Sequence, residues 1–334
     1  MAQRYPWTPW HDRLHRQLLR QPDLLPKKAC LLLAVSGGQD SIALLVLLND
    51  LVRLHHWDLL VWHGDHSWHA GSTAIAQELT EWCGHRDLPI LCNRAEVGST
   101  RTEAAARQWR YGQLTKLAKQ DGRDVVTGHT ATDRAETLLL QMARGTDLTG
   151  LASLRPQRPL DAAHPDGPQL RRPLLGFSRD DTLAICLELN LPIWLDPSNE
   201  NPIYARNRIR LAVLPVLEEL HPGSTHRIAA LAERVSQVRD TQQQLASIAL
   251  ETLRFGDGLD RRALGRLPAG TRRTLLANWL NQQGVKAIAA TALDRLSHRL
   301  ALGQPAGQCD LPDRCALVWQ GETLWLKRHG SSHH

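Results

Sequence analysis

The chain has 334 residues, of which 42% are hydrophobic and 22% are charged. This length corresponds to about two domains, and the composition excludes disordered, collagen-like and disulfide-stapled chains. The longest uninterrupted apolar runs, residues 29–35 and 42–48, are far shorter than the roughly 18–20 residues of a membrane-spanning helix. The first ten residues lack the apolar core of a signal peptide. We therefore expect a cytoplasmic protein that has no membrane partner.

The net charge is +6, and only six of the 40 basic residues are lysines. Arginine suits phosphate groups because its planar guanidinium can donate two parallel hydrogen bonds. Five arginines fall within the 13 residues 261–273, which contain no acidic residue: Arg261, Arg262, Arg266, Arg272 and Arg273. This cluster fits either a nucleic-acid contact or a solvated basic face.

Short apolar segments alternate with helix-compatible ones from residue 29 to about residue 195. Strands are predicted at 29–35, 59–63, 88–93 and 124–128, and helices near 41–54, 72–86, 102–120 and 131–143. Such alternation indicates a parallel sheet that is covered by helices on both faces. The loop 155–173 contains too many prolines and glycines for regular structure, and a helix is predicted after it at 178–190.

The second part of the chain has a mostly helical pattern, with helices predicted at 202–220, 224–255 and 271–300. The tail 309–328 is predicted to form a hairpin that turns at Gln320-Gly321. We place the domain boundary after residue 215. The prediction is an α/β domain over 1–215, followed by a smaller, mainly helical domain over 216–330 that ends in the hairpin.

The segment SGGQDS directly follows the first predicted strand and leads into a helix: Ser36, Gly37, Gly38, Gln39, Asp40 and Ser41. Glycines at such a turn allow the backbone to approach a ligand, and the free N–H groups of the helix N-terminus attract an anion. The serine hydroxyls add donors, and Asp40 can hold Mg²⁺ against phosphate oxygens. The alternative is an ordinary tight turn with a helix cap.

Two further sets of polar residues recur at helical spacing. Glu103, Arg107 and Arg110 share one face of a predicted helix, which is also typical of a solvated ion-pair surface. His129, Asp133 and Glu136 have the same four-then-three spacing just after a predicted strand. One imidazole and two carboxylates near a helix N-terminus can bind a cation and transfer protons.

The SGGQDS segment resembles the pyrophosphate-binding loop of the N-type ATP pyrophosphatases. Further segments follow it in order: RRPLL at 171–175, DPSN at 196–199 and YARNRIR at 204–210. In this order they resemble the tRNA(Ile)-lysidine synthetases, strongly over 29–215. Residues 250–328 are more loosely similar to the first C-terminal domain of that family, as in its short members that lack a second one.

The resemblance implies a parallel-sheet domain of the adenine nucleotide alpha hydrolase type and a two-step ligation. ATP, with Mg²⁺, adenylates the wobble cytidine of the isoleucine tRNA that has a CAU anticodon. Free L-lysine then displaces AMP to form lysidine. The C-terminal domain would bind the tRNA, and a homodimer is a further expectation from the family.

The resemblance also implies roles for individual residues. Ser36–Ser41 would hold the pyrophosphate, with Asp40 as a Mg²⁺ ligand, and Asp65, His66 and Arg107 would contribute to the ATP site. His129, Asp133 and Glu136 would line the lysine and cytidine side, any of them being the base, and Arg206 would contact ATP or the reacting phosphate. The expected tRNA contacts are Arg110, Arg261, Arg262, Arg272 and Arg273.

Two positions depart from the family pattern. Thr130 stands where a second histidine is usual, and His69 stands where an arginine is usual, which puts any phosphate contact of that arginine in doubt. His63, His66 and His69 recur at intervals of three. This spacing allows a metal site, although loop histidines beside a nucleotide are the simpler interpretation.

Three other functions compete with this interpretation. A tRNA 2-thiolation enzyme of the same superfamily would need paired or persulfide-forming cysteines, and the six cysteines of this chain never form a Cys-x-x-Cys pair. An amide-forming ATP pyrophosphatase would not need the arginine-rich C-terminal part. An RNA-binding module without activity would not need an intact loop and carboxylates.

Overall fold

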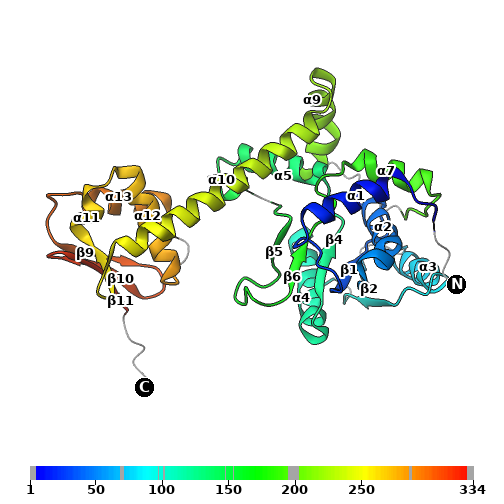
Figure 1. The fold of residues 1–334 in the computed structure, drawn as a ribbon, viewed down its shortest axis with the longest axis horizontal. Helices are drawn as coiled ribbons and strands as arrows, with labels where there is room; N and C mark the ends of the chain where they lie inside the picture. Colours follow the sequence, from blue (N-terminus) through cyan, green and yellow to red (C-terminus); the bar gives the residue numbers. More distant parts are fainter. Residues whose placement is uncertain are drawn as a thin grey trace. The chain divides into compact units, whose positions relative to one another are not determined.

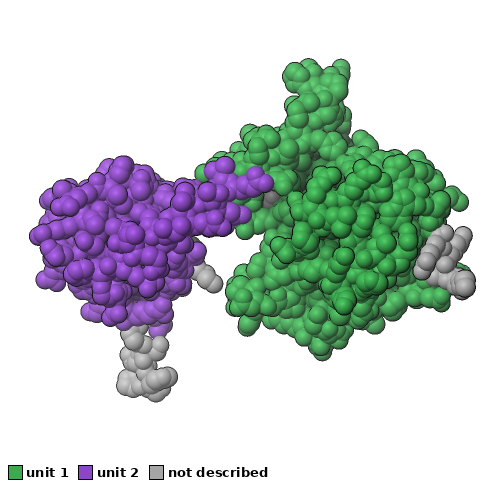
Figure 2. Space-filling view, viewed as in Figure 1, with its two compact units in different colours: residues 1–236 green, residues 237–334 purple. Residues whose placement is uncertain are grey.

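The computed structural model describes residues 5–67, 71–96, 98–100, 102–146, 148–152, 154–194, 203–285 and 288–328. The chain divides into two compact units, residues 1–236 and 237–334 (Figure 2). This division falls within the helix α10 (Ser224–Thr252), whereas we placed the domain boundary after residue 215. The 215/216 boundary stays a prediction, since an independently folding domain can end at a different residue from a compact unit.

The first unit is built on a six-stranded sheet with the order β3-β2-β1-β4-β6-β5. Neighbouring strands are parallel except for the edge pair β5 and β6, so the predicted parallel sheet is confirmed. The strands are β1 (Cys30–Ala34), β2 (Asp58–Asp65), β3 (Ile90–Arg94), β4 (Asp124–Thr127), β5 (Gln157–Pro159) and β6 (Gln169–Arg171).

Helices cover both faces of this sheet (Figure 1). The cores on the two faces contain α1 (Pro9–Arg20), α2 (Gln39–His55), α3 (Ser72–Gly84), α4 (Glu103–Asp121) and α7 (Arg179–Glu188). The helices α5 (Ala131–Ala143) and α6 (Leu148–Leu151) follow β4 along the chain. Side chains alternate between faces along a strand. Leu31 and Leu33 therefore pack in the core that contains α1, α2 and α7, while Leu32 packs in the core that contains α4.

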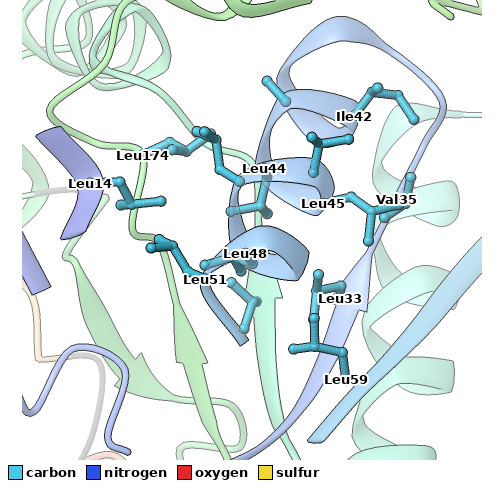
Figure 3. Packing of buried hydrophobic residues seen from close by; sticks show 14 of the residues in the cluster. Leu14, Leu33, Val35, Ile42, Leu44, Leu45, Leu48, Leu51, Leu59 and Leu174 are labelled. Atoms are coloured by element: carbon cyan, nitrogen blue, oxygen red, sulfur yellow. The ribbon is translucent and has the colours of Figure 1, made fainter. Parts of the chain in front are cut away.

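Other elements enclose the helix α2 on nearly all sides, which matches its apolar side chains on nearly all faces. Its leucines pack between the sheet, α1 and the segment before α7 (Figure 3). The labelled side chains are Leu14, Leu33, Val35, Ile42, Leu44, Leu45, Leu48, Leu51, Leu59 and Leu174. Burial of this kind anchors the N-terminus of α2, and with it the SGGQDS turn, on the edge of the sheet.

The prediction that residues 155–173 lack regular structure is wrong. Two three-residue strands, β5 and β6, extend the sheet beyond β4. Pro159 is tolerated because β5 is the edge strand, where a missing N–H leaves no partner unsatisfied. The helix α1 was not predicted, although Thr8 followed by Pro9 is a helix-start signal.

The first unit continues through α8 (Ala205–Arg208), a π-helical turn η2 (Ile209–Val213), α9 (Leu214–Leu220) and the start of α10. Pro215 has no N–H, so it cannot donate the i→i−4 hydrogen bond of an uninterrupted α-helix. The helix register changes directly before this residue.

The second unit has its own core and its own sheet. It contains α11 (Arg261–Arg266), α12 (Ala269–Gln282) and α13 (Ala290–Arg299). Its antiparallel strands have the order β7 (Arg254–Phe255), β8 (Gly258–Asp260), β11 (Thr323–Arg328), β10 (Cys315–Gln320) and β9 (Gly307–Leu311). Of the hairpin predicted over 309–328, β10 and β11 form the two arms, with Gln320 opposite Thr323, whereas residues 309–311 belong to a further strand, β9, of this larger sheet. Across the described residues, every helix is too short or too polar to cross a bilayer.

Candidate active site

The strand order places the candidate site at the ends of β1 and β4, whose onward connections lead to opposite sides of the sheet. Strand β1 lies between β2 and β4, and Ala34 of β1 is the register partner of Thr127 of β4. The segments after β1 and β4 therefore emerge side by side at the carboxyl edge of the sheet. Open α/β sheets bind ligands in the crevice at such a switch point. The SGGQDS turn and His129 both lie within this region.

The SGGQDS turn presents a helix N-terminus to this crevice. Helix α2 begins at Gln39, and Gly37 has a φ of +91°, a conformation that L side chains rarely adopt. The turn is held by its own hydroxyl, since Ser41 donates to the carbonyl of Gly38 at 2.9 Å and accepts from the N–H of Ser36 at 3.2 Å. These features fit the predicted anion site.

Gly128 brings the segment after β4 against the start of α2. A Cβ at this position would lie 2.8 Å from the carbonyl oxygen of Asp40 and 3.1 Å from the nitrogen of Ser41. Both are backbone atoms, so they cannot give way as a flexible side chain would. We did not predict this role for Gly128, although a glycine directly after a buried strand is a usable signal for close backbone approach.

The carboxylate of Asp40 is held by two residues of α7 that sequence reasoning missed. Arg179 donates from Nη1 to Oδ2 at 3.0 Å, and the hydroxyl of Thr182 donates to Oδ1. Burial raises the pKa of Asp40 to about 6, with Arg179 opposing the shift and the charge of Asp133 adding to it. Asp40 and Asp133 are thus close enough to repel each other.

The predicted residues Asp133, Glu136 and Arg206 meet directly. Arg206 donates from Nη2 to Asp133 Oδ1 at 3.0 Å and from Nε to Glu136 Oε2 at 2.7 Å. Arg210 lies further from the same pair, with its Nη1 3.9 Å from Glu136 Oε1. The helices α5 and α8, which are distant in sequence, are therefore joined at the site by one guanidinium.

Thr130, the departure from the family pattern, caps helix α5. The backbone N–H and the hydroxyl of Thr130 donate to Asp133 Oδ2 at 2.7 and 3.0 Å, completing a capping box. Burial alone would raise the pKa of Asp133, but Arg206, His129 and these hydrogen bonds lower it overall. Burial raises the pKa of Glu136, which is only 1% exposed.

His129 lies at the same edge of the sheet. Its Nδ1 is 2.8 Å from the hydroxyl oxygen of Thr127. Burial lowers the pKa of the imidazole, and the positive charges of Arg172, Arg206 and Arg107 act in the same direction, against Asp133. A lowered pKa makes the imidazole a weak base, so the fit of His129 to a role in proton transfer rests on its position and not on its pKa.

The donor set around Asp40 fits Mg²⁺ better than a softer metal. Among the described residues, no three His, Cys, Asp or Glu side chains form a ready metal cage. Mg²⁺ is usually held by one or two carboxylates together with substrate phosphates, and Asp40 with its neighbour Asp133 offers such oxygens. His63 and His66 have separate partners, the carbonyl of Val35 and Arg110, and His69 lies outside the described residues.

The other predicted ATP residues lie around the end of β2 and on α4. Asp65 accepts from the N–H of Ser67 at 2.7 Å and lies 3.4 Å from Arg94 Nε. Burial would raise its pKa, but these and other hydrogen bonds lower it. His66 accepts from Arg110, and Arg107 stacks over the ring of Tyr111. The predicted ATP role of Asp65, His66 and Arg107 remains a prediction.

The 196–199 segment and the Glu103 side chain are outside what the structure describes.

The arginines of the second unit differ in their exposure. Arg272 is only 5% exposed and donates to the carbonyls of Ser297, Gly265 and Leu267. Its guanidinium joins α12 to neighbouring segments, and the expectation that Arg272 contacts tRNA stays a prediction that this burial does not favour. Three other predicted tRNA residues keep surface positions: Arg261 donates to the Gln304 carbonyl, Arg262 pairs with Glu322, and Arg273 pairs with Asp294.

Comparison with known proteins identifies the family. The PP-loop domain family matches residues 11–217. A tRNA(Ile)-lysidine synthase of Parasynechococcus marenigrum is 62% identical over 327 residues, which cover 98% of this chain and 97% of that protein. The chain belongs to the tRNA(Ile)-lysidine synthase family. A second synthase, from Prochlorococcus marinus strain SARG, is 44% identical, with 96% and 97% of the two chains covered.

A solved structure supports the fold of this lysidine synthase family member. The U34-tRNA thiolase NcsA from Methanococcus maripaludis superposes with a TM-score of 0.57 at 20% identity, covering 68% of this chain and 79% of its own.

Near the SGGQDS turn, Cys186 has its thiol 3.5 Å from the carbonyl oxygen of Gln39. Burial raises the pKa of Cys186 to about 12, so this thiol is not poised for sulfur transfer.

Proposed function

We propose that the chain ligates L-lysine to the wobble cytidine of the CAU-anticodon isoleucine tRNA, with ATP cleaved to AMP and pyrophosphate. The observation that carries this proposal is the arrangement at the carboxyl edge of the sheet. A phosphate-binding turn and a cluster of one imidazole, two carboxylates and one arginine meet there within a lysidine synthase family fold. The turn serves ATP, and the cluster serves the amine and the nucleobase.

In the first step, the carbonyl oxygen of the cytosine ring attacks the α-phosphorus of ATP, and the bond to the β-phosphate oxygen breaks. The leaving pyrophosphate is received by the N–H groups at the start of α2 and by the hydroxyls of Ser36 and Ser41. Mg²⁺ at Asp40 would neutralise charge on the phosphates. The base is thereby turned into a good electrophile, since AMP can leave from its ring carbon.

In the second step, the side-chain amine of lysine attacks this ring carbon, and the carbon–oxygen bond to AMP breaks. Asp133 and Glu136 give the ammonium of lysine a counter-charge in place of Arg206, which frees Arg206 to approach phosphate oxygens. One of His129, Asp133 and Glu136 takes the proton that the amine must lose. The pKa of Glu136 is raised, whereas those of His129 and Asp133 are lowered, so Glu136 suits that role best.

The proposal includes a tRNA-binding role for the second unit, where Arg262 and Arg273 remain at the surface. It also includes a cytoplasmic location, because the substrate is tRNA. The expected homodimer stays a prediction, which analytical ultracentrifugation of the free chain can check.

Pyrophosphate release tests the proposed function. The purified chain is incubated with ATP, Mg²⁺ and the CAU-anticodon tRNA transcript, with and without lysine. Product formation must require both lysine and the tRNA, and the product nucleoside must have the mass of cytidine plus lysine minus water. A requirement for a sulfur donor would favour thiolation, and a requirement for ammonia would favour amide formation. Either result would contradict the proposal.

A further inference from the structure

A group of three arginines surrounds Tyr111 on the β6 side of the site; we refer to it as the Tyr111 cluster. The guanidinium carbon of Arg107 lies 4.8 Å from the centre of the Tyr111 ring, and that of Arg158 lies 5.7 Å from it. Arg172, directly after β6, is near enough to Tyr111 for the two side chains to interact electrostatically. The catalytic scheme above does not use these residues.

The Tyr111 cluster carries positive charge without a matching carboxylate. Within the described part of the chain, no Asp or Glu oxygen lies within 4.0 Å of Arg107, Arg158 or Arg172. The neutral carbonyls of Pro159 and Arg155 accept from Arg158 at 2.8 Å and from Arg172 at 2.7 Å. Arg172 is only 2% exposed, and its Nε is buried with no hydrogen-bond partner. Buried arginines are ordinarily paired, so this arrangement favours an anionic ligand.

The electrostatics of the cluster agree with this geometry. Burial lowers the pKa of Arg172 to about 10, and the nearby Arg158 and Arg107 contribute in the same direction. Burial would raise the pKa of Tyr111, yet the surrounding arginines lower it overall. An anion bound among these side chains would relieve the repulsion between the guanidinium groups.

The position of the cluster separates it from the pyrophosphate turn. Strand β6 pairs with β4, and Arg171 is the register partner of Val126, so Arg172 lies beside Thr127, two residues before His129. Strands β1 and β6 flank β4 on opposite sides, which places their ends about 10 Å apart at normal strand spacing. An anion at Arg172 would thus lie next to the nucleobase side of the site.

We propose that Arg172, Arg107 and Arg158 bind a backbone phosphodiester of the tRNA anticodon loop, next to the cytidine that enters the site. This inference rests on the proposed function and deepens it. Taking a base out of its stack requires the flanking backbone to be held, and arginine forks bind phosphate oxygens with defined geometry. The triphosphate of ATP has the same chemistry, so the experiment must separate the two sources. Arg107, which we expected to contribute to the ATP site, then contacts the RNA instead.

The test compares Arg107→Gln and Arg158→Gln with the matched variant Arg53→Gln. Arg53 is an exposed arginine in the last turn of α2, at the end of the helix away from the site. We expect both cluster variants to raise the Kd for the tRNA about 5- to 10-fold and to reduce the slope of log K against log salt by roughly 0.7 per lost contact. The KM for ATP should stay within about twofold of wild type, and Arg53→Gln should change neither constant.

Two results would overturn this inference. A raised KM for ATP with an unchanged Kd for tRNA would assign the cluster to the nucleotide. Unchanged constants in variants that fold normally by circular dichroism would leave the cluster a structural feature only. Arg172→Gln and Tyr111→Phe extend the series where they fold. Failure of the proposed function would show separately, because the wild-type chain would then release no pyrophosphate in response to lysine and tRNA.

Discussion

The proposed role of Asp40 as a Mg²⁺ ligand requires its carboxylate to exchange partners. In this structure both of its oxygens accept hydrogen bonds, one from Arg179 and one from Thr182. A metal ion and a proton compete for the same oxygens, and burial already raises the pKa of this group to about 6. Metal binding requires the deprotonated form, so the affinity of the proposed site for Mg²⁺ would depend on pH.

We predict that the Mg²⁺ requirement becomes steeper in acid. Below a pKa of about 6 the carboxyl group of Asp40 is mostly protonated, so the apparent Mg²⁺ constant for pyrophosphate release should rise about tenfold from pH 7 to pH 5. Free Mg²⁺ is set after allowing for the metal and proton equilibria of ATP. As a control, Asp40→Asn should abolish turnover but leave tRNA binding unchanged. A Mg²⁺ constant that stays flat across this range would remove Asp40 from the metal site.

The proposed mechanism requires the same kind of exchange at Arg206. It neutralises Asp133 and Glu136, of which Glu136 is almost fully buried. Removing one partner of a buried ion pair leaves an uncompensated charge, which is costly. Arg206 therefore stabilises the unliganded cluster, and in the proposed mechanism it occupies the position that the amine of lysine takes.

At the scale of elements, the cap of helix α5 couples stability to the charge of the site. Thr130 accepts from the N–H of Asp133 and donates two hydrogen bonds back to the Asp133 carboxylate. The same residue thereby starts the helix and favours the charged form of a site carboxylate.

We predict that Thr130→Ala lowers the free energy of unfolding by about 1 kcal/mol, as loss of a helix cap usually does. The variant also loses the hydroxyl hydrogen bond that lowers the pKa of Asp133, so the acid limb of the kcat profile should move to higher pH. Urea unfolding and pH–rate profiles measure the two effects. Thr130→Ser keeps the hydroxyl and should restore both. An alanine variant with wild-type stability and profile would show that the cap does neither.

The central strands were predictable because buried parallel strands appear as continuous apolar runs, as in Leu31–Val35. Strands β5 and β6 were not predictable, because each has only three residues. Their formation depends on the free edge of β4, with which β6 pairs. The shared helix face of His129, Asp133 and Glu136 was also predictable, because it follows from their spacing in the sequence. The contact of Asp40 with Arg179 was not predictable, since no pattern in the chain relates residues 139 positions apart.

At the scale of the whole molecule, the two units have separate hydrophobic cores. The core of the second unit contains Trp279 and Trp319, and it takes Ala246 and Leu250 from α10. Between Ala232 and Ala246, no residue of α10 is buried. Burial anchors each end of this helix within a different unit, which fits a division between ATP chemistry in the first unit and tRNA contact in the second.

The proposed division predicts that surface arginines of the second unit affect tRNA binding but not ATP use. Arg262→Gln with Arg273→Gln should weaken tRNA binding about tenfold and lower the salt slope by roughly 0.7–0.9 for each lost phosphate contact. Both side chains are partly exposed and paired with carboxylates that RNA phosphates can replace. Filter binding at several salt concentrations gives the slope, and the KM for ATP should not change. The buried Arg272 is unsuitable for this test, because Arg272→Gln removes three hydrogen bonds within the unit and should lower its stability instead. If the double variant folds normally and keeps the wild-type salt slope, the tRNA must be bound by other residues.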